Sequence, residues 1–75
     1  MSLQRGDYVW IERDDKRMQA MVTLASPNGK SLIVMFDGMF GGYLGMMPLS
    51  FEDGEYVDLI ERKPVKLERL ESEAN

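Results

Sequence analysis

Apolar and polar side chains alternate over short stretches of this sequence, which favours β-strands rather than helices. The clearest stretch covers residues 17–25, where Met18, Ala20, Val22 and Leu24 share one face and the residues between them share the other. A side-chain period of two predicts a strand with one face on the core.

Four further segments are also predicted to form strands, each from its own residue pattern. Residues 8–13 are rich in aromatic and β-branched types, and residues 30–36 contain an unbroken apolar run that predicts a strand buried on both faces. Residues 43–47 predict a shorter strand that Pro48 ends, and residues 55–60 predict a strand with mixed alternation.

Turn signals separate these segments. Residues 26–29 read Ser-Pro-Asn-Gly, which predicts a hairpin connection, and the pairs Asp37-Gly38 and Gly41-Gly42 predict a turn or bulge before the next strand. After Pro64, residues 65–69 fit a closing strand, which we prefer, or a short helical turn with two leucines three residues apart.

Five or six short strands with regular turn signals and no long helix predict an all-β fold. At 75 residues we expect one domain, a small five- to six-stranded partly open barrel over residues 5–70, followed by a polar tail at 71–75. A barrel is favoured over a sandwich because closing the sheet removes its exposed edges.

The sequence contains no cysteine and no histidine, which limits the kinds of site that the protein can form. It excludes disulfides, zinc sites built from these two residue types, and nucleophilic triads that need a histidine base. A site made only of carboxylates stays possible, as does an enzyme assembled from several barrels around a shared pore. We expect no cofactor, no metal and no enzymatic activity.

Thirteen acidic residues against nine basic ones give a net charge of −4, which disfavours a nucleic-acid surface. The alternative, a nucleic-acid-associated accessory barrel, stays open, with phosphates meeting four cations near one end: Arg5, Arg13, Lys16 and Arg17. The longest uncharged stretch, 38–51, is too short for a membrane span, and no signal-peptide pattern is visible. We expect a cytoplasmic protein that does not enter a membrane.

Three segments resemble the Src-homology-3-like barrel family, and within it the Tudor-like branch: residues 5–10 (Arg-Gly-Asp-Tyr-Val-Trp), 20–22 (Ala-Met-Val) and 34–38 (Val-Met-Phe-Asp-Gly). The resemblance implies an aromatic cage for a methylated cation, with Phe36 and Tyr43 on either side of the third turn. The sequence departs from that pattern before the second strand, where Arg17-Met18 stands at the usual position of a cage aromatic.

The most informative segment is Ser31 to Phe51, which holds four of the seven methionines and only one charged residue, Asp37. A small barrel cannot bury all of its large apolar side chains, and exposed apolar patches mark interfaces. The predicted protein-binding residues, for a protein partner or for self-association into a homo-oligomer, are Met39, Phe40, Tyr43, Met46 and Met47. The alternative is a satellite core under the loop. Trp10, the only tryptophan, is expected at the core or the barrel rim; we prefer the core, and the alternative is a platform for a ligand.

Overall fold

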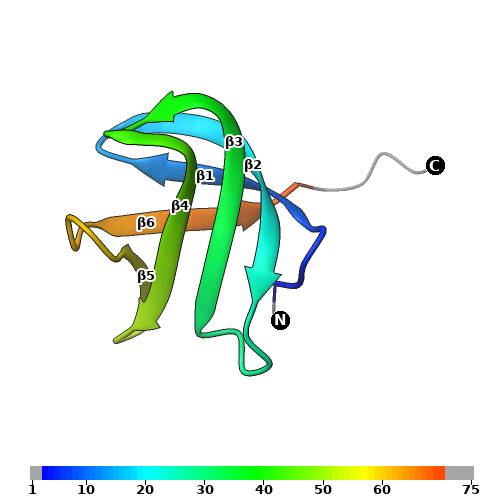
Figure 1. The fold of residues 1–75 in the computed structure, drawn as a ribbon. Helices are drawn as coiled ribbons and strands as arrows, with labels where there is room; N and C mark the ends of the chain where they lie inside the picture. The colour runs from blue at the N-terminus through cyan, green and yellow to red at the C-terminus, as the bar shows by residue number, and fades with distance from the viewer. Residues whose placement is uncertain (1–2, 71–75) are drawn as a thin grey trace.

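Six strands follow one another around a closed antiparallel barrel in a computed structural model that describes residues 3–70 (Figure 1). The strands are β1 (Tyr8–Arg13), β2 (Lys16–Ala25), β3 (Ser31–Phe40), β4 (Tyr43–Glu52), β5 (Glu55–Asp58) and β6 (Pro64–Arg69). Pairing of β1 with β6 closes the ring. The predicted all-β barrel is confirmed, and it is closed around its circumference. The predicted tail at 71–75 lies outside the described residues.

Three of the hairpins turn through two residues that both have positive φ: Asp14-Asp15 (53° and 66°), Gly41-Gly42 (57° and 89°) and Asp53-Gly54 (52° and 85°). Two consecutive positive φ values define a type I′ turn, whose twist matches that of the flanking strands. Aspartate and glycine tolerate this region best, so local sequence fixes the register of three hairpins.

Strands β3 and β4 are longer than predicted and form one bent hairpin that arches over an end of the barrel (Figure 1). The predicted end of β4 at Pro48 is wrong, because the strand continues to Glu52. The Pro48 carbonyl accepts a hydrogen bond from Leu59 N at 3.2 Å. Because proline has no N–H, Pro48 cannot donate a bond back to Leu59, but this position lies just past the end of β5 at Asp58, so no pair within β5 is interrupted.

Toward the C-terminal end of the barrel, one strand boundary differs from the predicted one. Strand β5 ends at Asp58 rather than at residue 60, because residues 59–61 turn around the Asp58 carboxylate. The segment after Pro64 is a strand, β6, which confirms the preferred alternative over the helical one.

Two bulges change which side chains face inward. In β2 the register shifts between Val22 and Leu24, so that Val22 is fully buried whereas Leu24 is 57% exposed. The predicted common face for these two residues is therefore wrong, since an extra residue reverses the alternation. In β3 a second shift lies between Met35 and Met39.

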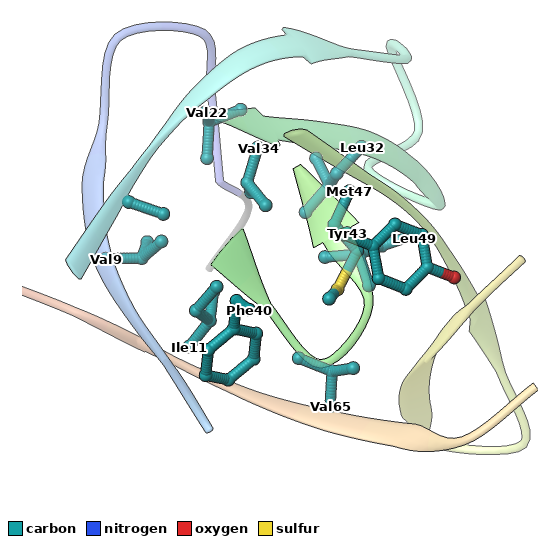
Figure 2. Close-up of a cluster of buried hydrophobic side chains, with 11 residues drawn as sticks. Val9, Ile11, Val22, Leu32, Val34, Phe40, Tyr43, Met47, Leu49 and Val65 are labelled. Atoms are coloured by element: carbon teal, nitrogen blue, oxygen red, sulfur yellow. The ribbon is translucent and has the colours of Figure 1, made fainter. Parts of the chain in front are cut away.

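The core lies along the barrel axis and consists of side chains from β1, β2, β3, β4 and β6. Figure 2 shows ten of them converging from the wall: Val9, Ile11, Val22, Leu32, Val34, Phe40, Tyr43, Met47, Leu49 and Val65. Trp10 is not among them, since its neighbours Val9 and Ile11 face inward and Trp10 faces outward. The prediction that Trp10 belongs to the core is wrong.

Candidate functional site

The outer side of β2, β3 and β4 carries apolar side chains in register with one another. Met21 pairs with Met35, and Met35 pairs with Met46, so three methionines lie side by side across three strands. Directly paired residues in neighbouring strands project from the same side of a sheet. Strand β1 extends this row, because Tyr8 pairs with Met21.

A second row and a third pair flank the methionines. Leu24 pairs with Ile33, which pairs with Pro48, and toward the hairpin end Met39 pairs with Leu44. We name the whole surface the β2–β4 apolar face and define it by eight residues: Met21, Leu24, Ile33, Met35, Met39, Leu44, Met46 and Pro48.

Solvent reaches much of the β2–β4 apolar face. Met35 is 45% exposed, Met46 50%, Met39 64% and Leu44 75%. None of its members is charged, and Asp37, the single charged residue between Ser31 and Phe51, lies in the β3 bulge instead. A continuous uncharged apolar surface of this kind is unusual on a monomeric protein.

One edge of the β2–β4 apolar face is hollowed. Leu24, Ile33, Pro48 and Leu59 contribute to a shallow depression of about 380 Å³ above the second row. The bulge in β2 creates it, because Leu24 would otherwise point into the barrel.

The structure separates the five predicted binding residues into two groups. Met39 and Met46 lie on the β2–β4 apolar face. Phe40, Tyr43 and Met47 are buried at 4%, 7% and 0% exposure, so their expected place on a surface is wrong. The Gly41-Gly42 turn pairs Phe40 with Tyr43 on the inner side, and alternation along β4 then turns Met47 inward and Met46 outward.

The aromatic cage implied by the family resemblance is absent at the expected residues. Phe36 is only partly buried, but its ring packs edge-on against the buried Phe40 at 6.1 Å between centroids. The Tyr43 ring is buried, and its hydroxyl donates a short hydrogen bond to Asp58. Neither ring is placed to enclose a ligand cation with the other.

A buried polar cluster at one end of the barrel escaped the sequence analysis. Asp58 is fully buried and accepts hydrogen bonds from the Tyr43 hydroxyl, from Arg13 Nη1 at 2.8 Å and from the amide of Glu61 at 2.6 Å. Arg13 is 5% exposed and also donates from Nη2 to the Gly41 carbonyl at 2.6 Å. The cluster joins β1, β4, β5 and two turns.

These partners control the ionisation of Asp58. Its burial alone would raise the pKa, but the Tyr43 hydroxyl, the Glu61 amide and the Arg13 guanidinium together outweigh burial and lower the pKa to about 2. Burial raises the pKa of Tyr43, and its hydrogen bond to Asp58 adds to that rise. At neutral pH the cluster therefore contains a carboxylate, a guanidinium and a neutral phenol.

Gly41 leaves room for the Arg13 guanidinium because it has no side chain. A Cβ at this position would lie 2.1 Å from Arg13 Nη2, inside van der Waals contact. Its φ of 57° also belongs to the region that glycine tolerates best. The cluster has the satisfied geometry of a structural brace, with no buried side-chain donor or acceptor left unpaired within residues 3–70.

The four cations proposed to meet phosphates do not form a free basic patch. Arg13 is buried in the Asp58 cluster, and Arg17 is paired with Glu68 at 3.0 Å. Only Arg5 and Lys16 are exposed and outside the ion pairs found within residues 3–70. Two separate cations are too few to bind along the phosphates of a nucleic-acid backbone.

Comparison with protein-family models, with curated proteins and with solved structures finds no match. Within residues 3–70, no helix is long and apolar enough to cross a membrane, and no group of acidic side chains is arranged to hold a metal ion. Within residues 3–70, the β2–β4 apolar face is the best-defined candidate site.

Proposed function

We propose that this barrel is a non-enzymatic interaction module that self-associates through the β2–β4 apolar face. The observation that carries the proposal is the register of Met21, Met35 and Met46, which places three uncharged side chains in one row across three strands, with Met35 and Met46 exposed. Methionine is flexible and polarisable, so such a row can adapt to an opposing surface. In overall form the six-stranded antiparallel barrel suits an assignment to the Src-homology-3-like class.

The absence of charge favours a second copy of this chain as the occupant. A partner with charged groups at the contact would have to bury them without counter-charges, which is costly. A second copy presents the same uncharged face, and a two-fold axis brings like residues together without any unpaired charge.

The closed ring determines how two copies can meet. Every strand pairs with a neighbour on each side of the ring, so the barrel has no strand with a wholly unpaired edge for strand addition. Association therefore has to pack one outer face on another, and sheets stacked in this way lie about 10 Å apart. A small barrel without disulfides also gains stability when a partner covers its apolar surface.

The direct test is the molar mass in solution, measured by light scattering after size exclusion at low and high salt. We expect a dimer that persists at high salt, because apolar burial is not screened. The variant Met35→Ser/Met46→Ser should raise the dissociation constant by about tenfold or more. Ile60→Ser is the control, since Ile60 is 73% exposed but lies in the β5–β6 turn.

A wild-type chain that stays monomeric at high concentration would contradict the proposal. So would equal weakening of the dimer by Ile60→Ser and by the methionine variant. Circular dichroism of each variant shows whether a lost dimer reflects a lost fold.

A further inference from the structure

A second surface lies on the opposite side of the barrel from the β2–β4 apolar face. It is a groove of about 710 Å³ formed by β1, the turn into β2 and the start of β2, β6 and the β4–β5 hairpin, which we name the β1–β6 groove. Strands β1 and β6 stand three places from β4 and β3 in the closed strand order. The two surfaces can therefore be occupied at the same time.

Carboxylates outnumber cations in the lining of the β1–β6 groove. Five of them face two cations, Arg17 and Lys66; the five are Glu12, Asp14, Asp15, Glu55 and Glu68. Outside the groove the chain has eight acidic residues and seven basic ones, so most of its net charge of −4 is concentrated here. None of the ion pairs within residues 3–70 involves Glu12, Asp15 or Glu55.

Aromatic rings and aliphatic side chains complete the groove. Phe51 and Tyr56 pack edge to face at 4.9 Å between centroids, and the Tyr56 hydroxyl donates to the Gly29 carbonyl at 2.7 Å. The Tyr56 ring is therefore held in place before any ligand arrives. Trp10 contributes the third ring, and Pro64 and Leu67 add aliphatic surface.

The Trp10 ring already holds a cation. The Arg17 guanidinium lies 4.2 Å from the ring centroid and is paired with Glu68 at 3.0 Å. Both partners of this ion pair are exposed, at 47% and 73%, so water screens their attraction and the pair is easily exchanged. An incoming guanidinium or ammonium group can take the place of Arg17 on the ring while Glu68 remains as its counter-ion.

From these features we infer that the β1–β6 groove binds a basic, extended peptide segment of a partner protein. Cationic side chains of that segment lie on Trp10 and between Glu12 and Glu55, and its backbone and small side chains cover Pro64 and Leu67. The inference is independent of self-association, because it uses different residues on the other side of the barrel.

Trp10 provides the assay, since it is the only tryptophan in the chain. The probe is an acetylated, amidated eight-residue peptide of alternating arginine and alanine, titrated into the full chain at low salt while Trp10 emission is recorded. We expect a saturable change, a fall in affinity with added salt, and no change with the peptide that has glutamate in place of arginine.

Two charge-reversal variants distinguish peptide binding in the β1–β6 groove from a general attraction between the basic peptide and the acidic protein. Glu55→Lys and Asp37→Lys both change the net charge from −4 to −2, but only Glu55 lines the β1–β6 groove. Glu55→Lys also places a lysine opposite Glu52, a favourable cross-strand pair, so it should remain folded. We expect Glu55→Lys to weaken peptide binding about tenfold and Asp37→Lys to weaken it less than about threefold.

Three results would overturn the inference. They are no saturable signal up to about 1 mM peptide, equal weakening by the two lysine variants, and spermine binding as tightly as the peptide, which would show that the groove selects charge alone. Because dimerisation is measured separately by light scattering, failure of either proposal leaves the other one standing.

Discussion

The two outer sides of this barrel differ in chemistry although the same alternation builds both. On the β2–β4 apolar face the outward positions are methionine, leucine, isoleucine and proline, and none is charged. Across the ring, the outward positions of β1 and β6 include Glu12, Lys66 and Glu68. Inward positions on both sides are apolar apart from Arg13, which is held in the Asp58 cluster, so the inner pattern serves folding and the outer pattern is left to serve interactions.

The Asp58 cluster supports both sides, and its loss should have the largest effect. Replacing Asp58 with alanine leaves the Arg13 guanidinium buried without its counter-charge, which should lower the free energy of unfolding by about 3–5 kcal/mol. Urea denaturation measures the change. Both self-association and peptide binding should fall together, because β1, β4 and β5 lose their common brace.

The exposed Asp37→Ala is the matched control for this change. Asp37 has no ion pair within residues 3–70, so its free energy of unfolding should stay within about 0.5 kcal/mol of the wild type. Similar losses from Asp58→Ala and Asp37→Ala would show that the cluster is not a brace.

Two adjacent methionines of β4 sharpen the contrast between inner and outer positions. Met47 is fully buried and Met46 is 50% exposed, although they have the same chemistry. Met47→Ala should lower the free energy of unfolding by about 2–5 kcal/mol, because it removes buried apolar surface and leaves a cavity. Met46→Ala should change stability little in the monomer and weaken the dimer instead.

Denaturation and light scattering on both methionine variants separate these effects. A Met46→Ala protein as unstable as Met47→Ala at a concentration where the chain is monomeric would contradict the assignment of inner and outer faces.

The smallest expected effect is on the pH dependence of stability. The pKa of Asp58 falls from 3.8 to about 2 on folding, so its contribution is complete above about pH 4 and is lost as the pH falls toward 2. The loss amounts to about 2 kcal/mol by linkage. Urea denaturation between pH 5 and pH 2 should show it, and Asp58→Asn should lack this part of the pH dependence.

At alkaline pH, stability is lost as the pH rises, which is opposite to the dependence at acid pH. Folding raises the pKa of Tyr43, so the stability that its protonated hydroxyl contributes is complete below pH 10 and is lost as the pH rises through the folded value. Tyr43→Phe should remove this alkaline dependence. A wild type and a Tyr43→Phe variant with identical alkaline profiles would contradict the role of the hydroxyl.

Local sequence was sufficient to predict most of the fold. Aromatic and β-branched content predicted β1, alternation predicted most of β2, the Gly41-Gly42 pair marked the turn between β3 and β4, and the succession of short strands and turns predicted an all-β barrel. These features depend on neighbours a few residues apart, so they can be recognised without knowledge of the final contacts.

The candidate site was harder to predict because it depends on register. An extra residue near Leu24 turns that side chain outward, and the Gly41-Gly42 turn sends Phe40 and Met47 inward. The Arg13–Asp58 pair joins residues 45 positions apart, a separation that no local pattern reports. The only signal available for it was an aspartate between the apolar Val57 and Leu59 of the strand predicted at 55–60.

The most direct test of self-association through the β2–β4 apolar face is the distance between spin labels in two copies. The chain has no cysteine, so Asp37→Cys gives one label beside that face and Lys66→Cys gives one on the opposite side. Pulsed electron paramagnetic resonance should show strong dipolar coupling between labels at position 37 and much weaker coupling at position 66. Equal coupling at both positions, or none at position 37, would contradict the account.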